Sequence, residues 1–303
     1  MRSAHEKRTI VKIKGGLGNQ MFQYACARAM QIRMGQKLAL NISSYERDGK
    51  RCFGLNHLNI SEDCALLREK TRKERFFDPN TNRVLKAAMK FSPDLAFRVC
   101  KRFNAFVWDR DRYIPLNPGQ DRDIYLNGYW QSEKYFFPAE AAIKSELTVK
   151  EPLSPCSEAL LEEIQNGESV CVHIRCGDYF SPKYVRFLVC DPTYYNDAID
   201  FLRKKLDRPR FYVFSDDCAY SRRILKDERD IIIVDQNNPD YEDLKLMCHC
   251  RHFIISNSTF SWWAQYLSEN ERKIVIAPER WKTSNSCRDI YQENWTILQN
   301  RKP

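Results

Sequence analysis

The stretch Ser169-Val-Cys-Val-His173-Ile-Arg175-Cys-Gly177-Asp178-Tyr179 joins a short apolar strand to a polar loop. Similar Val- and Ile-rich runs recur through the second half of the chain without polar alternation, which is typical of strands buried on both faces of a parallel sheet. They are predicted at residues 170–175, 211–215, 231–235, 253–256 and 274–277. Helix-length segments separate them, at residues 157–165, 193–206, 219–226, 241–249 and 258–268. This alternation predicts a doubly wound α/β domain.

The first half opens with its own βαβ unit. A strand is predicted at Thr9–Ile13, a helix to about Gly35 and a second strand at Lys37–Asn41, before the chain becomes irregular, helical and rich in aromatic residues. The two prolines of Pro152-Leu-Ser-Pro155 indicate a boundary. We therefore expect an N-terminal domain over 1–152 and a C-terminal domain over 153–303, two α/β domains facing a cleft.

The loop that starts at His173 is the first candidate site. In open α/β sheets, ligands bind at the carboxyl ends of strands. Arg175 offers a rigid fork of donors that matches phosphate oxygens, and Gly177 lets backbone approach a ligand closely. Two interpretations stay open: a site for the diphosphate of a nucleotide, and an Arg–Asp ion pair that fixes the strand end.

A second polar turn lies at Ser256-Asn-Ser258-Thr259-Phe260-Ser261-Trp262-Trp263, between a predicted strand and a predicted helix. Hydroxyls and free N–H groups at a helix N-terminus bind anions, although one serine would also serve as an N-cap. The turn holds more hydroxyls than a cap requires, which favours a bound phosphate. Trp262 and Trp263 are expected to be packing residues.

The third segment is Lys14-Gly15-Gly16-Leu17-Gly18-Asn19-Gln20-Met21-Phe22-Gln23, at a strand–helix junction. Its glycine spacing fits neither the dinucleotide fingerprint nor the Walker loop. Asn19 and Gln20 are suited to hydroxyl recognition, because each amide both donates and accepts. They are equally suited to helix capping.

Composition narrows the class. The chain has 303 residues, of which 43% are hydrophobic, so it can bury a substantial core, and no apolar run is long enough to span a bilayer. The charged N-terminal segment does not read as a signal peptide, so a cytoplasmic protein with reduced cysteines is expected. The spacing of Cys248-His-Cys250 fits no common zinc site, and no metal is predicted. A net charge of +9 suits anionic small molecules or an anionic membrane face, and no nucleic-acid-binding signature accompanies it.

Together, these segments resemble the α-1,2-fucosyltransferases of glycosyltransferase family 11. That family carries G-G-L-G-N-Q-[ML]-F-Q-Y-A early, H-x-R-R-x-D-Y centrally and S-N-S-[ST]-F-S-W-W near the end. These motifs correspond to Gly15–Ala25, His173–Tyr179 and Ser256–Trp263 here, and Asn127–Ser132 and Phe214–Asp217 are also similar to the family. One residue departs from the pattern: Cys176 stands where the family has its second arginine.

The resemblance implies a GT-B-like pair of Rossmann-type domains and inverting transfer of L-fucose from GDP-β-L-fucose, without metal or other cofactor. The acceptor it implies is the 2-hydroxyl of a galactose-containing glycan, and a terminal galactose is expected. We expect the protein in the cytoplasm, and peripheral contact with the inner membrane face stays an open alternative. Oligomeric state is not predicted.

The same resemblance assigns roles to individual residues. Arg175, Asp178 and Asn19 are the catalytic candidates, with Asp178 as the base if one acts. Donor binding is assigned to His173, Arg175, Asp243, Ser258, Thr259, Phe260, Gly16, Gly18, Asn19 and Gln20. Asp243 would accept hydrogen bonds from guanine. Two alternatives remain: a transferase that uses another nucleotide sugar, and a non-catalytic glycan-binding protein on the same fold.

Overall fold

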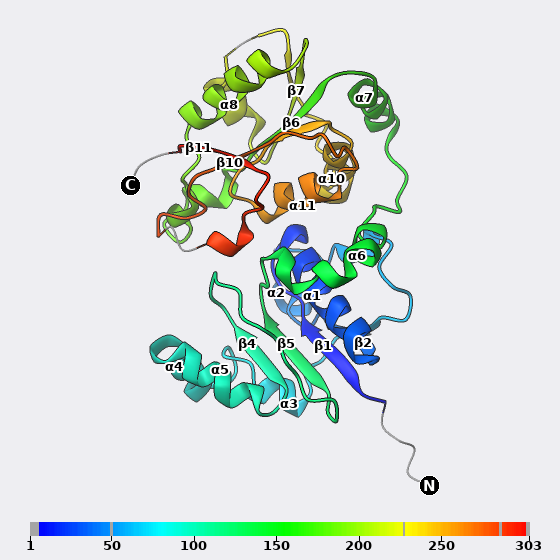
Figure 1. Ribbon diagram of the computed structural model, residues 1–303, viewed down its shortest axis with the longest axis vertical. Coiled ribbons are helices and arrows are strands. Elements are labelled where there is room, and N and C mark those ends of the chain that lie inside the picture. The colour runs from blue at the N-terminus through cyan, green and yellow to red at the C-terminus, as the bar shows by residue number, and fades with distance from the viewer. Residues whose placement is uncertain (1–5, 49–50, 227, 285–286, 301–303) are drawn as a thin grey trace. The chain divides into compact units, whose positions relative to one another are not determined.

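The computed structural model describes residues 6–48, 51–226, 228–284 and 287–300. The chain divides into two compact units, Met1–Leu147 and Thr148–Pro303, so the division falls shortly before the predicted boundary at 152/153. Each unit is built on one parallel sheet that is flanked by helices (Figure 1). None of the helices among the described residues is long and apolar enough to span a bilayer.

The C-terminal unit holds a six-stranded parallel sheet in the order β8-β7-β6-β9-β10-β11. In chain order this is 3-2-1-4-5-6, the order of doubly wound dinucleotide-binding sheets, in which the direction of winding reverses between the first and fourth strands. The strands are β6 (Ser169–Ile174), β7 (Arg210–Ser215), β8 (Ile231–Ile233), β9 (His252–Ile254), β10 (Val275–Pro278) and β11 (Thr296–Leu298). The helices are α7 (Pro155–Asn166), α8 (Pro192–Lys205), α9 (Cys218–Ile224), α10 (Asp240–Cys248) and α11 (Thr259–Leu267). The predicted doubly wound domain is confirmed, and β11 was not predicted.

The elements of the C-terminal unit could be predicted from the sequence because their strands and helix faces are buried and therefore apolar. All six residues of β6 are buried, and the central strands pack against Tyr194, Ile199 and Leu202 on one face of α8. Trp262 and Trp263 in α11 are fully buried against one another, so the packing role expected for them is confirmed.

The N-terminal unit holds a five-stranded parallel sheet in the order β3-β2-β1-β5-β4. Its strands are β1 (Arg8–Lys12), β2 (Lys37–Asn41), β3 (Ala65–Leu67), β4 (Ala105–Trp108) and β5 (Ile124–Gly128). Its helices are α1 (Leu17–Met34), α2 (Tyr45–Asp48), α3 (Arg72–Phe76), α4 (Arg83–Phe91), α5 (Pro93–Lys101) and α6 (Glu140–Glu146). The predicted opening βαβ unit is β1-α1-β2, and α1 ends at Gly35, which adopts the left-handed conformation of a C-cap.

The prediction that the remainder of this half is irregular was wrong, because β3, β4 and β5 complete the sheet. The strands β4 (Ala-Phe-Val-Trp) and β5 (Ile-Tyr-Leu-Asn-Gly) are short and are separated by a charged loop, so the sequence window around them shows no clear period. Helix α5 lies beside β4 (Figure 1). The ring of Phe97 in α5 packs on Phe106 and Trp108 of that strand.

Candidate active site

Two of the predicted polar segments meet where the C-terminal sheet reverses its winding. His173 lies near the carboxyl end of β6 and Ser256 follows β9, the neighbouring strand, with the Ser256 hydroxyl 3.0 Å from His173 Nδ1. The hydroxyl of Tyr179 donates to the carbonyl of Asn257 at 3.1 Å and joins the loop after β6 to the turn after β9. The crevice at such a reversal is the usual ligand site of an open α/β sheet.

Arg175 is held by a residue to which the sequence assigned no role. Its Nη1 lies 2.8 Å from the carboxylate of Asp216, which follows β7, and each side chain is about a quarter exposed, 27% and 24%. The same carboxylate accepts from the backbone N–H of Cys176 at 2.9 Å. Asp216 therefore fixes both the guanidinium and the backbone beside it, while both charged groups remain accessible to solvent.

Gly177 is required by this arrangement. A Cβ atom at position 177 would lie 2.3 Å from an Asp216 oxygen, a distance that no pair of non-bonded atoms tolerates. Only glycine allows the loop after β6 to approach the carboxylate this closely. The predicted ion pair and the predicted ligand site are thus compatible, because the partner is Asp216 at the end of the next strand.

Cys176 lies where the site borders the apolar core. Its side chain is buried in the apolar core, and its thiol lies 3.4 Å from Asp216. Burial raises the pKa of this thiol, so at neutral pH it carries no charge. A buried, neutral thiol beside Asp216 therefore occupies the position of the family's second arginine.

His173 is neutral at physiological pH. Burial lowers its pKa to about 4, and the nearby Arg175 adds to this effect while Asp216 opposes it. Its ring packs at an angle against Phe260, with centroids 5.7 Å apart. A neutral imidazole at this point can exchange hydrogen bonds without adding a charge.

Most hydroxyls of the Ser256–Ser261 turn, which the sequence predicted to bind a phosphate, form hydrogen bonds within the protein. Ser258 is the N-cap of α11 and accepts from the N–H of Phe260, while Ser261 bonds to backbone carbonyls of the same turn. Ser256 is engaged with His173. The inference from surplus hydroxyls therefore holds only for Thr259, which has no hydrogen-bond partner of its hydroxyl among the residues that the structure describes. The predicted helix does begin in this turn, so the N-terminus of α11 follows β9 at the sheet reversal.

Asp243 lies in the first turn of α10 and accepts from the side-chain amide of Asn238 at 3.0 Å. Burial raises its pKa to about 6, and the neighbouring acids Glu242 and Asp240 add to the increase, while the bond from Asn238 opposes it. A carboxylate poised in this way gains from any further donor that a ligand supplies. The side chain of Asp178, the predicted base, lies outside the described residues, so its role stays a prediction.

In the N-terminal unit, the glycine loop connects β1 to α1. Gly15 has a φ of +88°, and the N-cap of α1 is Gly16, without a side-chain cap. The capping alternative for Asn19 and Gln20 is therefore wrong. The oxygen of Asn19 accepts from the side chain of Gln131, after β5, at 2.7 Å.

Gln20 and Gln23 hold this loop in place. The buried amide of Gln20 donates to the carbonyls of Gly15 and Cys52 and accepts from the N–H of Gly54. Gln23 bonds to both the N–H and the carbonyl of Lys14. The ligand roles predicted for Gly16, Gly18, Asn19 and Gln20 stay predictions, and the contacts of Gln20 describe a structural role.

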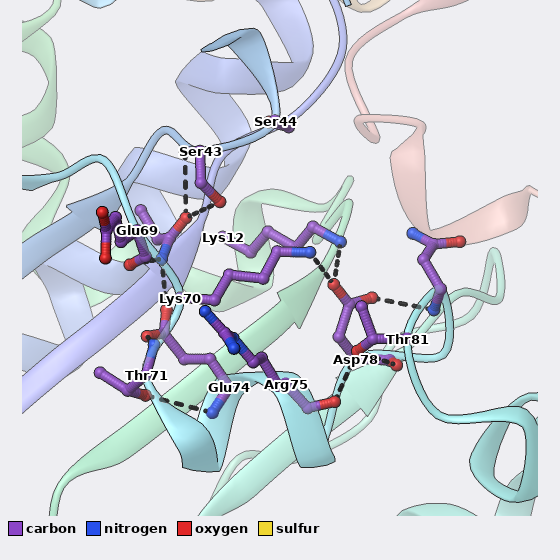
Figure 2. Close-up of polar contacts among 12 residues, drawn as sticks. Lys12, Ser43, Ser44, Glu69, Lys70, Thr71, Glu74, Arg75, Asp78 and Thr81 are labelled. Carbon is purple, nitrogen blue, oxygen red and sulfur yellow. Dashed lines mark hydrogen bonds and ion pairs between the residues drawn. The ribbon is translucent and has the colours of Figure 1, made fainter. Parts of the chain in front are cut away.

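A second charged cluster lies at the carboxyl end of β1 (Figure 2). Lys12 and Lys70 both contact one oxygen of Asp78, at 2.9 and 2.5 Å. The side chains of Lys12 and Asp78 are 5% and 0% exposed, so this pair is internal. Nearby, Asn41 donates to Glu74, which forms a capping box with Thr71 at the start of α3. Glu74 is buried, although most of the residues around it in α3 are exposed.

Sequence reasoning missed two residues of these sites, Asp216 and Gln131. Asp216 was noticed only within the segment Phe214–Asp217 and Gln131 only within Asn127–Ser132. A polar residue directly after an apolar strand is the signal that could have identified Asp216, whereas Gln131 is separated from β5 by Tyr129 and Trp130.

Comparison with known proteins gives the site a context. The model of glycosyl transferase family 11 matches residues 103–299. The α-1,2-colitosyltransferase of Escherichia coli is 30% identical over 299 residues, 96% of this chain and 98% of that protein. The galactoside 2-α-L-fucosyltransferase Sec1 of Mus musculus is 27% identical over 85% of this chain and 64% of its own length.

Among solved structures, the α-1,6-fucosyltransferase NodZ co-crystallised with GDP aligns with a TM-score of 0.56 and 14% identity, over 90% of this chain and 96% of NodZ. The fucosyltransferase NodZ from Bradyrhizobium gives a TM-score of 0.54 at 13% identity, over 86% of this chain and 93% of that one. These likenesses support the fold, two Rossmann-type units of the GT-B class, as the sequence predicted.

Proposed function

The chain belongs to glycosyl transferase family 11, and from this premise we propose that it transfers L-fucose from GDP-β-L-fucose to the 2-hydroxyl of a terminal galactose, with inversion to an α-1,2 linkage. The observation that carries the proposal is the cluster at the point where the C-terminal sheet reverses. Arg175 is held there by Asp216, and His173 bonds to Ser256 in the turn that leads into α11. A preformed guanidinium beside free helix N–H groups is suited to the diphosphate of the donor.

The chemistry places the largest charge change on the leaving group. The bond between the anomeric carbon and the β-phosphate oxygen breaks, its electron pair stays on GDP, and the acceptor oxygen bonds to the carbon from the opposite face. Arg175 and the α11 N-terminus would stabilise the growing negative charge, and one preorganised donor of this kind contributes about 3–4 kcal/mol. Thr259 and Phe260, at the start of that helix, would contact the β-phosphate.

The acceptor must lose a proton as the new bond forms. Asp178 is the base in this proposal, although GDP is a leaving group good enough to lower the demand for a strong base. His173 is neutral and buried and would contact the nucleoside or the phosphate. The reaction is proposed to need no metal ion, and turnover in excess EDTA tests that point.

Donor selection is proposed to depend on Asp243. Its carboxylate would accept hydrogen bonds from the N1–H and exocyclic amine of guanine, which uracil cannot supply in the same geometry. A galactose-bearing glycan is the proposed partner, together with peripheral contact at a membrane surface where that glycan is lipid-linked. Asn19 and Gln20 are proposed to face the sugars from the other unit.

A colitosyl donor is the second candidate, because a colitosyltransferase is 30% identical to this chain over nearly its full length. Incubation with GDP-fucose, GDP-colitose, GDP-mannose and UDP-sugars, each with a galactoside acceptor, separates the candidates. Fucose transfer with an α-1,2 linkage by NMR is expected. Preference for another donor would show that GDP-fucose is not the donor substrate. If a sensitive assay detected no transfer and no donor hydrolysis, the non-catalytic alternative would be favoured.

A further inference from the structure

The outer surface of helices α4 and α5 in the N-terminal unit exposes large apolar side chains. Val84 and Phe91 in α4 are 80% and 79% exposed, and Leu95 and Val99 in α5 and Phe103 after it are also exposed. Isolated apolar residues on a surface need no explanation, but five within 20 residues of chain form a patch. We call the outer face of residues 83–103 the α4–α5 surface.

The buried sides of these helices show that the exposure is not a packing defect. Helix α4 buries Leu85, and α5 buries Ala96 and Cys100 against the sheet. Given 100° per residue, Val84, Ala87 and Phe91 share a stripe on α4 that points away from Leu85. Leu95 and Val99 lie one turn apart on α5 and flank its buried face, so they extend the apolar side of that helix into solvent. Both helices therefore carry apolar side chains in the core and others in solvent.

Basic side chains border the apolar ones. Residues 83–103 hold six basic residues (Arg83, Lys86, Lys90, Arg98, Lys101 and Arg102) and one acidic residue, Asp94. Asp94 is paired with Arg112, so its charge is already compensated from outside the segment. The ammonium of Lys90 lies over the ring of Phe91, 5.4 Å from its centroid. The α4–α5 surface thus combines exposed apolar anchors with an uncompensated positive charge.

We propose that the α4–α5 surface docks the protein onto an anionic lipid bilayer. A helix that lies in the membrane interface has apolar residues on the side that enters the acyl boundary and Lys or Arg at headgroup level. Each basic residue near an anionic surface contributes attraction, and long basic side chains can extend from a partly inserted helix to the headgroups. A second copy of this chain docked through the same face would cover the apolar residues but would bring two sets of six basic residues together.

This inference adds a membrane-binding surface to the proposed transferase. It rests on the proposed function in one respect, because a lipid-linked acceptor would explain why the protein binds a membrane. The docking itself is a property of residues 83–103. Binding can therefore be measured without any turnover, and turnover on a soluble galactoside can be measured without vesicles.

The test is co-sedimentation of the full chain with vesicles of equal parts phosphatidylglycerol and phosphatidylcholine, and with phosphatidylcholine alone. We expect binding to the anionic vesicles that weakens as salt is raised, because exposed charges are screened. The double variant Phe91→Ser/Leu95→Ser should bind roughly tenfold or more weakly, as expected when apolar anchors no longer leave water. Lys86→Glu/Lys90→Glu should bind more weakly by about the same factor.

Matched controls come from exposed residues outside the surface. Phe137→Ser removes an aromatic ring that is also well exposed, and Lys204→Glu reverses a charge on α8, so both should bind like the parent chain. All variants should transfer sugar to a soluble acceptor at the parent rate. Absence of vesicle binding, or equal loss in the controls, would overturn the proposal. So would a chain that self-associates through this face, shown by dimers in analytical ultracentrifugation that the Phe91→Ser/Leu95→Ser variant abolishes.

Discussion

Each unit places a cation–carboxylate pair at the carboxyl end of its first strand, and the two pairs differ in one respect. Lys12 and Asp78 in the N-terminal unit are almost completely buried, whereas Arg175 and Asp216 in the C-terminal unit are each about a quarter exposed. Both pairs lie beside the strand at which the sheet reverses. The two sheets thus have an ion pair at equivalent strand ends. The exposure of the charged side chains distinguishes the structural pair from the pair that a ligand can reach.

The surroundings of the two pairs reinforce this contrast. Asp78 is enclosed by two lysines and by its own turn, where it accepts from the N–H of Asn80. Arg175 and Asp216 lie close enough to His173 to shift its pKa, and that histidine is neutral and bonded to Ser256. Breaking the first pair should cost stability, and breaking the second should cost activity.

The largest effect is expected for Asp78→Ala. Burial alone would raise the pKa of Asp78, but the bonds from Lys70 and Lys12 lower it to about 2, so the carboxylate is ionised whenever the protein is folded near neutrality. Its removal leaves a buried lysine unpaired and should lower the free energy of unfolding by about 3–5 kcal/mol. Urea denaturation measures this loss. Glu46→Ala, in an exposed pair with Arg68, should cost less than about 1 kcal/mol, and equal costs would end the contrast.

Arg175→Ala should lower kcat/KM by about 10²–10³-fold, because the developing charge on GDP loses its preformed partner. Steady-state kinetics and a thermal melt, measured together, separate this loss from unfolding. The matched control is Arg203→Ala, which removes an Arg–Asp pair of similar exposure that lies next to the amino end of β8 in the same sheet. An equal fall in kcat/KM for both variants would mean that Arg175 acts through stability.

Asp216→Asn is expected to reduce kcat/KM by about 10–100-fold, since Asp216 positions Arg175 and a displaced group loses much of its effect. Asp216 is a positioning residue, so the double variant with Arg175→Ala should be no slower than Arg175→Ala alone. Additive losses in this double-mutant cycle would instead assign Asp216 an independent role. Asp230→Asn, at the other end of the sheet, serves as the control.

The smallest effect concerns pH. Because burial raises the pKa of Asp243 to about 6, its carboxylate becomes protonated as pH falls from 7 to 5 and can then no longer accept two donors. GDP affinity should fall by up to about tenfold over this interval and level off above pH 7. Asp243→Asn should bind GDP more weakly at pH 7 and show little change down to pH 5. Calorimetry of both proteins checks this, and parallel curves would remove Asp243 from the binding site.

Much of the C-terminal unit could be predicted because its strands are buried on both faces and therefore apolar throughout. Arg175, His173 and the Ser258 turn were placed at strand ends from the same pattern, and the structure brings them together. Asp216 was missed as the partner of Arg175 because the two are neighbours only through the pairing of β6 with β7, which no local pattern encodes.

The N-terminal unit was less readable for a related reason. Its strands β4 and β5 are short. The place of β5 beside β1 is set by pairing between residues far apart in the chain, such as Thr9 with Ile124, and β4 then pairs with β5 at the sheet edge. The bond between Asn19 and Gln131 spans a similar separation, so the capping alternative for Asn19 could not be rejected from the sequence. The hydroxyl count of the Ser256–Ser261 turn misled because serine oxygens also bond to the backbone of their own turn.

The side-chain amide of Gln23 bonds to both the N–H and the carbonyl of Lys14, and these two hydrogen bonds affect how the junction responds to heating. These bonds order the glycine-containing junction between β1 and α1 when the chain folds. The conformational entropy of the junction is therefore lost on folding, and binding of a sugar does not have to order it again. On warming, this junction should keep its shape until the whole N-terminal unit melts.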